Sequence, residues 1–363
     1  MKTVTHVVGA RPNFMKIAPI MEALRGAAGI RQCLVNTGQH YDEAMAGGFL
    51  RDLQLPTPDR NLGIGSGAHG AQTAKIMAAF EDVCLDDRPD LVVVVGDVNS
   101  TMAATLVAAK LQIPVAHVEA GLRSFDRTMP EEINRIVTDR LASLLLTPSA
   151  DADANLTAEG VPASHIHRVG NVMIDTLLRF LPVAGRERIR DRLPIVDRDY
   201  AVMTLHRPSN VDEPGTLAGI LDVIGEISRR LPVVFPVHPR TRARLAAFGL
   251  PTDSDQLMLT EPLGYIDFLS LTSNARLILT DSGGLQEEST ALGIPCLTMR
   301  DSTERPVTVT EGTNEVVGTA RAAVLAGFER AMAVNGRAVR RPALWDGHAA
   351  ERVASVLTKA LAG

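Results

Sequence analysis

Short apolar runs alternate with longer amphipathic stretches along the whole chain. The run Leu91–Val95 is apolar at every position, which is typical of a parallel strand covered by helices on both faces. Between two such runs, apolar residues recur at helical spacing from Leu217 to Ile227, and Leu231-Pro232 ends this predicted helix. The repeated strand-then-helix order predicts right-handed crossovers and doubly wound parallel sheets.

Twelve strands are predicted in this way. In the first half of the chain they are Thr5–Val8, Gln32–Thr37, Leu91–Gly96, Val115–Val118, Leu144–Thr147 and His167–Val169. In the second half they are Tyr200–Leu205, Val233–Val237, Leu257–Leu259, Leu277–Thr280, Cys296–Met299 and Glu315–Val317. The polar stretch Gly185–Arg198 separates the two sets, so we expect an α/β protein with two Rossmann-like, doubly wound domains.

The length of the chain agrees with this division, because 363 residues suit two domains of about 150 to 200 residues each. We expect the N-terminal domain over residues 1–170, completed by a C-terminal helix over residues 349–363. A linker is expected over residues 171–198, and the C-terminal domain over residues 199–348.

Composition excludes several classes of partner. The net charge is −5 without a long basic run, which argues against nucleic acid. No stretch approaches the roughly 20 apolar residues of a membrane span, and the N-terminus lacks the apolar core of a signal peptide. The three cysteines are too few and too widely spaced for a disulfide framework or a metal cluster. We therefore expect a cytoplasmic protein with no membrane partner and no metal.

Two glycine-containing turns follow predicted strands, where doubly wound sheets bind their ligands. Gly9–Lys16 offers a helix N-terminus with the cations Arg11 and Lys16, although it is not a GxGxxG motif. In Asp281–Glu288, the turn Ser282-Gly283-Gly284 lets a phosphate approach the backbone, and Glu288 can accept hydrogen bonds from ribose. The alternative is that both are ordinary strand-to-helix turns whose acids complement the helix dipole.

Three carboxylates are predicted to meet at neighbouring strand ends. Asp97 and Glu119 each follow a strand, and Glu131 begins a helix after Pro130. Carboxylates that crowd together raise one another's pKa, which supplies an acid and a base near neutral pH. Alone, Glu131 has an adequate role in stabilising its helix N-terminus. Metal ligation is a further alternative, but no histidine pair has the required spacing.

Two histidines follow strands of the second domain. His206 precedes an arginine, and His238 lies two residues before Arg240. If both face one crevice, phosphate contact or proton transfer is expected. The loop Arg300–Pro306 adds charge at the same edge through Glu304 and Arg305.

Taken in order, these motifs resemble the non-hydrolysing UDP-N-acetylglucosamine 2-epimerases. The resemblance covers nearly the full chain. It rests on Gly9–Pro12, Thr37–His40, Gly96-Asp97, His117–Arg123, Ser124–Arg127, Pro130–Arg135, Leu205–Asp212, Asp281–Glu288 and Thr303–Pro306. The chain departs from the family pattern at Val98, where Thr is frequent, and at Val307, where Glu is frequent.

The resemblance implies a GT-B architecture, with the active site in a central cleft between the domains. It implies interconversion of UDP-GlcNAc and UDP-ManNAc through elimination of UDP to a 2-acetamidoglucal, with no cofactor, and a homodimer. It also gives roles to the matching residues. Asp97, Glu119 and Glu131 are the acid/base candidates, and His206 assists the departing diphosphate. The substrate-binding residues are Arg11, Lys16, Arg135, His238, Ser282, Gly283, Gly284, Glu288 and Arg305.

Several alternatives stay open at this point. A relative acting on a 2,3-diacetamido-uronic acid nucleotide sugar would need extra cations for the C6 carboxylate, and Arg240 and Arg242 are the candidates. A hydrolysing 2-epimerase would release free ManNAc, and a glycosyltransferase would need an acceptor site. A non-catalytic nucleotide-sugar sensor would not need Asp97, Glu119 and Glu131 together.

Overall fold

The computed structural model describes residues 1–38, 53–186, 189–193, 195, 199–250, 256–334 and 341–362. The motif residues Gln39 and His40 lie outside the described residues. The chain divides into two compact units. Unit 1 consists of Met1–Thr176 with Ala343–Gly363, and unit 2 is the continuous segment Leu177–Pro342.

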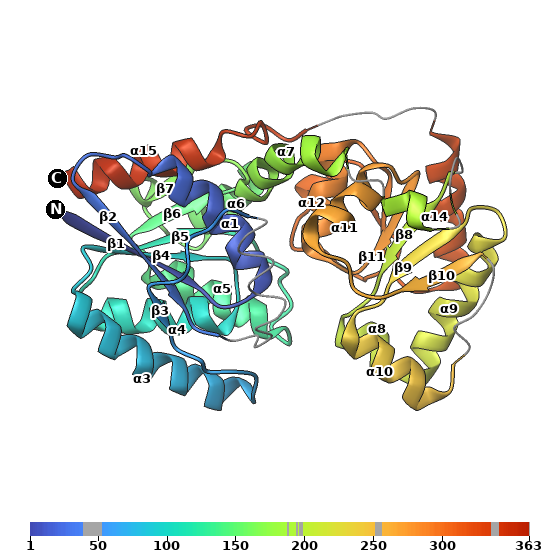
Figure 1. The fold of residues 1–363 in the computed structure, drawn as a ribbon, viewed down its shortest axis with the longest axis horizontal. Helices are drawn as coiled ribbons and strands as arrows, with labels where there is room; N and C mark the ends of the chain where they lie inside the picture. Colours follow the sequence, from blue (N-terminus) through green and yellow to red (C-terminus); the bar gives the residue numbers. More distant parts are fainter. Residues whose placement is uncertain are drawn as a thin grey trace. The chain divides into compact units, whose positions relative to one another are not determined.

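Unit 1 contains a parallel sheet of seven strands (Figure 1). The strands are β1 (Lys2–Val8), β2 (Ile30–Asn36), β3 (Arg60–Asn61), β4 (Leu91–Val95), β5 (Val115–Val118), β6 (Leu144–Thr147) and β7 (Ile166–Arg168). Their order is β3-β2-β1-β4-β5-β6-β7. The first six strands thus follow the Rossmann order 3-2-1-4-5-6. In register, Val4 lies beside Leu91 and Val92 beside Val115, so the apolar β4 is in the centre.

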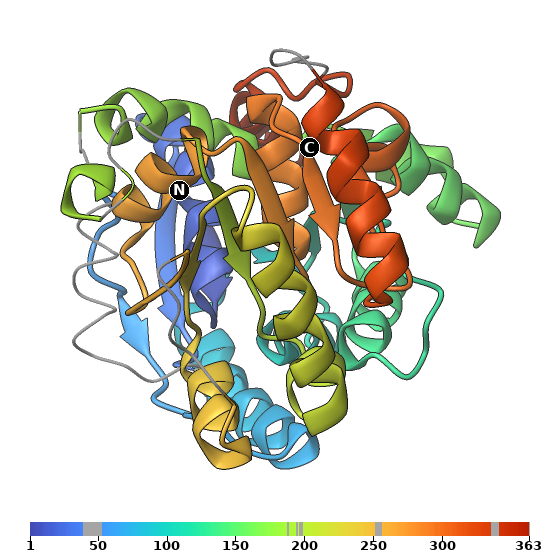
Figure 2. The same ribbon diagram turned by 90° about the vertical axis from the view of Figure 1, so that its right-hand side faces the viewer.

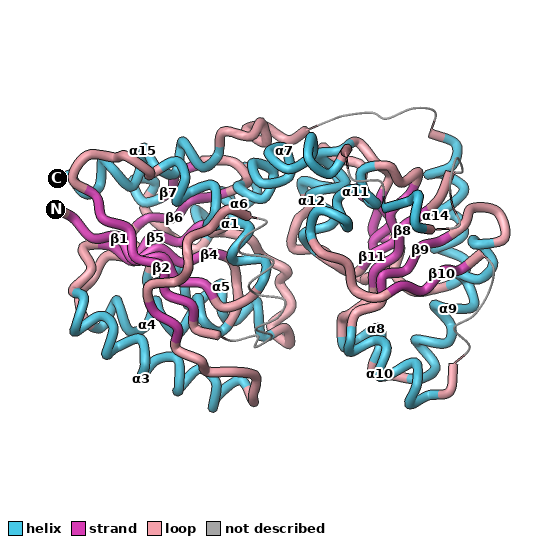
Figure 3. The backbone as a smooth tube through the Cα atoms, in the orientation of Figure 1, coloured by secondary structure: helices cyan, strands magenta, loops and turns pink. Residues whose placement is uncertain are grey.

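Helices cover both faces of this sheet. They are α1 (Arg11–Ala23), α3 (His69–Asp87), α4 (Asn99–Lys110), α5 (Pro130–Leu141), α6 (Ala150–Ala158), the 3-10 helix η1 (Ala163–His165) and α15 (Ala349–Ala362). Helices α3, α4 and α5 pack on one face, and α1 packs with α15 on the other (Figures 1 and 3). The buried indole N–H of Trp345 donates to the carbonyl oxygen of Pro148 (3.0 Å), which anchors the chain just before α15.

Unit 2 contains a parallel sheet of six strands in the order β10-β9-β8-β11-β12-β13, again the Rossmann order. The strands are β8 (Ala201–Thr204), β9 (Val233–Pro236), β10 (Leu257–Thr260), β11 (Leu277–Thr280), β12 (Cys296–Thr298) and β13 (Asn314–Val316). The longer helices are α9 (Pro214–Ser228), α10 (Pro239–Phe248), α11 (Tyr265–Ser273), α12 (Gly283–Leu292) and α14 (Arg321–Ala333). Two single-turn helices, α8 (Pro208–Val211) and α13 (Val307–Thr310), complete the unit. Figure 2 shows α9 and α14 side by side on one face of the sheet, and α11 and α12 lie on the other (Figure 1).

The predicted α/β class with two Rossmann-like sheets is confirmed, and each of the twelve predicted strands is present. Strand β3 was not predicted, because it has only two residues, both exposed. The segment expected as a linker contains helix α7 (Val172–Ala184) and the 3-10 helix η2 (Ile189–Arg192). None of the described helices is long and apolar enough to cross a membrane. The central cleft stays a prediction.

Candidate active site

Polar residues gather at the carboxyl ends of strands in both units. In each sheet the strand order reverses beside the first strand, since β1 lies between β2 and β4, and β8 lies between β9 and β11. Ligands of doubly wound sheets bind at such a reversal. Asp97 comes shortly after β4 and Asp281 directly after β11, so each unit carries a carboxylate at this point.

A buried ion pair joins α1 to the end of β5 in unit 1. The ammonium of Lys16 lies 2.5 Å from Oε2 of Glu119, and both side chains are less than a tenth exposed. Gly96 lies beside this pair, because a Cβ at that position would be 2.9 Å from Nζ of Lys16. Its φ of +69° also favours glycine. The absence of a side chain at Gly96 therefore leaves room for Lys16 to reach Glu119.

Arg135 on α5 connects two further carboxylates. One of its guanidinium nitrogens lies 2.5 Å from Oδ2 of Asp97, and another lies 3.0 Å from Oε2 of Glu132. Glu132 is buried, and it also accepts hydrogen bonds from the backbone N–H groups of Ser124 (2.9 Å) and Phe125 (3.0 Å). Asp97 is thus held by Arg135, whose own position is fixed by the buried Glu132.

In unit 2, Asp281 orients His206. Nδ1 of His206 lies 2.9 Å from Oδ1 of the fully buried Asp281, whose other oxygen accepts from the backbone N–H groups of His206 and Arg207 (2.9 Å each). Burial alone would raise the pKa of Asp281, but the hydrogen bonds and charge of His206 outweigh it and lower the pKa. Because Nδ1 is engaged and the side chain is 41% exposed, Nε2 of His206 is left as the group that can face a ligand.

A cluster of buried charges surrounds the first turn of α12. Glu304 pairs with Arg305 (2.6 Å), Arg300 (2.8 Å) and Arg207 (3.4 Å), and Arg305 also pairs with Glu287 (2.9 Å). Burial would raise the pKa of Glu304, but the three arginines together hold it well below its usual range. A Cβ at Gly283 would lie 2.4 Å from a guanidinium nitrogen of Arg305, so a side chain there would displace this arginine from its ion pairs.

Glu288 lies one turn further along α12. Burial, followed by the neighbouring charge of Glu287, raises the pKa of Glu288 to about 8. The charge of Glu288 in turn contributes to raising the pKa of the buried Tyr265, after the larger effect of burial. A carboxyl group with this raised pKa at a strand-end helix is a candidate for ligand binding.

The remaining predicted residues have the following places. Arg11 is exposed at the first position of α1, whereas Lys16, expected to share its anion, is buried against Glu119. Glu131 is half-buried at the second position of α5. The exposed His238 accepts a hydrogen bond from the backbone N–H of Arg240 (3.2 Å), and its ring centroid lies 5.8 Å from that of His206. Ser282 is half-buried just before α12 and Gly284 is its second residue.

The arginines suspected of binding a C6 carboxylate are engaged within unit 2. Arg240 forms a two-pronged ion pair with Asp212. Arg242 lies 3.1 Å from Glu261 and donates to the carbonyl oxygen of Thr260 (3.0 Å). Both side chains are exposed and have guanidinium N–H groups outside these pairs, so an anion can bind beside the present partners.

Sequence reasoning missed residues behind the predicted ones. Glu132, rather than its neighbour Glu131, joins the Arg135 network, and Asp281 was seen only as part of a turn. Asp139 on α5 was not singled out, although it binds His117, Gly121 and Arg123. Helical spacing carried a signal for Glu132 and Asp139, because they are seven positions apart and therefore lie on one face of α5.

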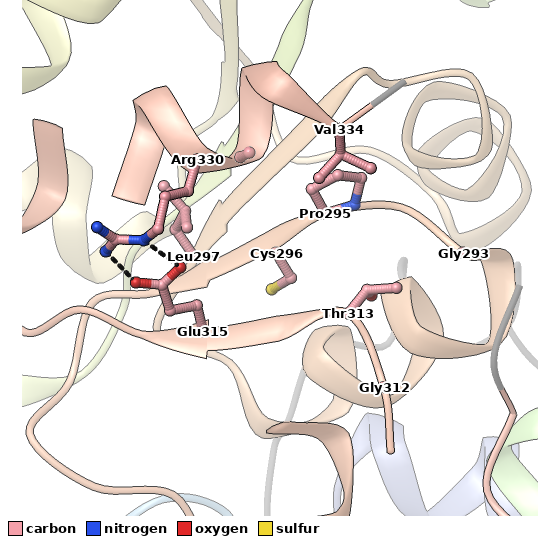
Figure 4. Close-up of a pocket in the computed structure, with 10 residues that line it drawn as sticks. Gly293, Pro295, Cys296, Leu297, Gly312, Thr313, Glu315, Arg330 and Val334 are labelled. Carbon is pink, nitrogen blue, oxygen red and sulfur yellow. Dashed lines mark hydrogen bonds and ion pairs between the residues drawn. The ribbon is translucent and has the colours of Figure 1, made fainter. Parts of the chain in front are cut away.

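A cavity of about 250 Å³ lies away from these groups, at the amino-terminal ends of β12 and β13 (Figure 4). Its lining includes Pro295, Cys296 and Thr313, and the ion pair between Glu315 and Arg330 lies at one side. The charged loop Arg300–Arg305 follows the opposite end of β12, so the cavity is separate from the candidate site.

Comparison with known proteins identifies the family. The family model described as UDP-N-acetylglucosamine 2-epimerase matches residues 22–358. A UDP-N-acetylglucosamine 2-epimerase of Methanocaldococcus jannaschii is 43% identical over 97% of this chain and 98% of its own length. A UDP-2,3-diacetamido-2,3-dideoxy-D-glucuronate 2-epimerase of Pseudomonas aeruginosa is 40% identical over 99% of this chain and 100% of its own.

A solved structure of the M. jannaschii enzyme, in complex with UDP-GlcNAc and UDP, has a TM-score of 0.92 with this chain. It is 43% identical, and the match covers 98% of this chain and 99% of that one. With a family match over most of its length, this chain belongs to the UDP-N-acetylglucosamine 2-epimerase family.

Proposed function

We propose that this chain interconverts UDP-GlcNAc and UDP-ManNAc without hydrolysis. The observation that carries this proposal is the full-length similarity to the M. jannaschii enzyme, whose structure contains UDP-GlcNAc and UDP. In the proposed reaction the C2 proton moves to a protein base, and the C1–O bond to the diphosphate breaks. The electron pair of the C2–H bond forms the C1=C2 double bond of a 2-acetamidoglucal. A proton then returns to the opposite face of C2 while UDP adds back to C1.

The carboxylates of unit 1 are the proposed acid and base. Asp97 contacts Arg135, and Glu119 contacts Lys16. Glu131, the third candidate, is half-buried on α5. A partnered carboxylate keeps a fixed direction, which lowers the cost of placing it against C2. A sensor would need only UDP contacts, so this set of acids supports an enzyme.

The strand ends of unit 2 are the proposed UDP site. Ser282, Gly283 and Gly284 are proposed to hold the diphosphate. The N–H of Ser282 donates to Oγ1 of Thr280 (2.9 Å), so the proposed donors are its hydroxyl and the N–H groups of Gly283 and Gly284. These glycines begin a helix of 10 residues, whose N-terminus favours a diphosphate. His206, held through Nδ1 by Asp281, can donate from Nε2 to the departing diphosphate oxygen. Arg11 and Arg305 are proposed to bind the phosphates, and Glu288 the ribose. Because C2–H is weakly acidic, this stabilisation of the leaving group is what makes elimination feasible.

A second candidate substrate is a UDP-2,3-diacetamido-uronic acid. The similarity to the P. aeruginosa enzyme, at 40% identity over the full length, favours keeping it. Arg240 and Arg242 are the residues proposed to bind its C6 carboxylate. A cytoplasmic homodimer that supplies surface polysaccharide synthesis is also proposed, on the resemblance alone.

Proton NMR in D₂O tests the proposed reaction. The purified chain with UDP-GlcNAc should give UDP-ManNAc that carries deuterium at C2. Free ManNAc with UDP would identify a hydrolysing enzyme instead. If UDP-GlcNAc stays unchanged, even at a high concentration that tests its action as an activator, the UDP-2,3-diacetamido-uronic acid is tested next. A chain that converts neither substrate would be assigned as a non-catalytic nucleotide-sugar sensor.

A further inference from the structure

His117, on the interior strand β5, is fully buried and has a partner at each ring nitrogen. Nδ1 lies 2.6 Å from Oδ1 of Asp139, and Nε2 lies 2.8 Å from the carbonyl oxygen of Gly96. A fully buried side chain cannot touch a sugar. Any part that His117 has in the reaction must therefore act through the groups that it holds.

The carbonyl partner of His117 requires a proton on one ring nitrogen. A carbonyl oxygen only accepts hydrogen bonds, so Nε2 must donate to Gly96. Oδ2 of Asp139 accepts from Arg123 (2.7 Å) and from the backbone N–H of Gly121 (3.0 Å). Burial would raise the pKa of Asp139, but His117 and then Arg123 outweigh it and lower the pKa. Both ring nitrogens of His117 are therefore engaged, and the ring is held at two points.

The buried charges next to His117 are paired. Arg123 pairs with the buried Asp139 and also with the more exposed Glu159 (2.7 Å each). Such pairing is what allows charge to persist away from water.

The backbone groups bound by His117 and Asp139 flank two of the three proposed acid/base residues. Gly96 directly precedes Asp97, and Glu119 lies between His117 and Gly121 in sequence. Gly96, Glu119 and Gly121 all have left-handed φ values, of +69°, +73° and +82°. This conformation costs free energy for a residue with a side chain such as Glu119, so the surrounding contacts must fix it. A second anchor is the carbonyl oxygen of Leu146, which accepts from the N–H of Glu119 (3.0 Å).

We propose that His117 is a positioning residue, which acts with Asp139 to fix the two turns that present Asp97 and Glu119. This inference rests on the proposed epimerase function, because it concerns the placement of its acid and base. It assigns no contact with substrate to His117. A carboxylate displaced by about 1 Å can lower turnover about 100-fold, which is the effect expected when the anchor is lost.

Two variants of the full chain separate positioning from general stability. In His117→Gln the amide nitrogen can replace Nε2 and donate to Gly96, whereas in His117→Asn the side chain is too short to reach it. We expect His117→Asn to lower kcat about 100-fold, while KM and the affinity for UDP change less than about threefold. We expect His117→Gln to recover at least about tenfold of this loss. Equal losses in both variants, or a wild-type kcat in His117→Asn, would overturn the proposal.

A spectroscopic measurement tests the same inference without turnover. In wild-type protein labelled with ¹⁵N-histidine, the resonances that disappear in His117→Gln should show a proton on Nε2, the nitrogen that donates to Gly96. A His117 whose Nε2 carries no proton would overturn the inference, even if His117→Asn does not fold. A wild-type chain that is inactive on UDP-GlcNAc would instead refute the proposed function, so the two failures are distinguishable.

Discussion

At the scale of single residues, the ion pair between Lys16 and Glu119 is a contact in which burial makes charge costly. Both side chains are less than a tenth exposed, so removing one partner leaves a charge in a poorly solvated place. We expect Lys16→Met to lower the free energy of unfolding of unit 1 by about 3 to 5 kcal/mol. Replacing both partners, in Lys16→Met with Glu119→Gln, should restore most of this loss but not turnover, because the pair is neutralised as a whole.

The single tryptophan makes this measurement specific to one unit. Trp345 is 1% exposed and belongs to unit 1, so its fluorescence during urea unfolding follows that unit. A loss in Lys16→Met smaller than about 1 kcal/mol would mean that the pair is solvated. Equal destabilisation of the single and double variants would mean that Lys16 acts through packing of its stem.

Glu288 gives a pH-dependence with a defined sign. Its pKa is raised to about 8, so the carboxyl group is mostly protonated at pH 7 and ionised at pH 9. If the ionised form accepts hydrogen bonds from both ribose hydroxyls, affinity for UDP-GlcNAc should rise up to about tenfold between pH 7 and pH 9. Calorimetric titration in a Glu119→Gln background, which suppresses turnover, checks this. Glu288→Gln is the control, and its affinity should not follow this rise; a parallel rise in both proteins would remove Glu288 from the site.

The residue scale also shows what sequence can reveal about a site. Position after a strand was the signal that selected Asp97, Glu119 and His206, and Glu288 was selected from the turn that begins its helix; their roles stay predictions. The direction in which a side chain points could not be deduced in the same way. Glu131 and Glu132 are adjacent and chemically alike, and only the packing of α5 turns Glu132 toward Arg135. Likewise, Lys16 was expected to bind an anion of the substrate, whereas its nearest anion is Glu119.

At the scale of elements, the attachment of α15 to unit 1 depends on a side chain far away in sequence. Asp175 on α7 accepts hydrogen bonds from the first two backbone N–H groups of α15, at Ala349 (3.2 Å) and Ala350 (2.6 Å). Removing this cap in Asp175→Ala should cost about 1 to 2 kcal/mol and increase hydrogen exchange along α15. Asp175→Asn keeps an acceptor and should retain most of the protection, so equal exchange in both variants would contradict the capping role.

The same carboxyl group predicts how stability changes with pH. Burial raises the pKa of Asp175 from 3.8 to about 6, so the folded chain holds a proton there that the unfolded chain has already lost. Stability from this group therefore falls as pH rises from about 4 to about 6, with a slope of up to about 1.4 kcal/mol per pH unit. Asp175→Asn lacks this contribution. Urea unfolding of both proteins should show that the free energy of unfolding of the wild type falls relative to that of Asp175→Asn across this pH range. A difference between the two proteins that does not change with pH would contradict the raised pKa.

The elements themselves were largely predictable, because β-branched runs and helical spacing are local signals. The apolar run at β4 and the periodic residues of α9 are examples, and both are buried as expected. Strand β3 was missed because Arg60–Asn61 has no apolar pattern and exists only through its pairing with β2. No local pattern indicates that Ala349–Ala362 packs beside α1, because this contact joins elements far apart in the sequence.

At the scale of the whole molecule, the two units differ in how the chain builds them. Unit 2 is one continuous segment, whereas unit 1 is assembled from both ends of the chain. The two points of unit 1 between which unit 2 is inserted lie close together. Gly170 lies against the backbone of Leu344, and Asp175 accepts a hydrogen bond from the N–H of Ala349. Unit 2 could therefore be removed and the two parts of unit 1 rejoined by a short linker.

This arrangement predicts that UDP recognition can be separated from catalysis. Most residues proposed to bind UDP belong to unit 2, and its sheet has its own buried core from Ala201 to Ala331. We expect a fragment of residues 172–342 to fold and to bind UDP within about tenfold of the full chain, without turnover. A chain of residues 1–176 joined to 341–363 should fold, as reported by Trp345, but bind UDP far more weakly. Tight UDP binding by this rejoined unit 1, or its absence from a folded fragment 172–342, would place the nucleotide site outside unit 2. The diphosphate would then bind at the same strand ends as Asp97 and Glu119. The proposal that unit 2 binds UDP while unit 1 carries the acid and base would be wrong.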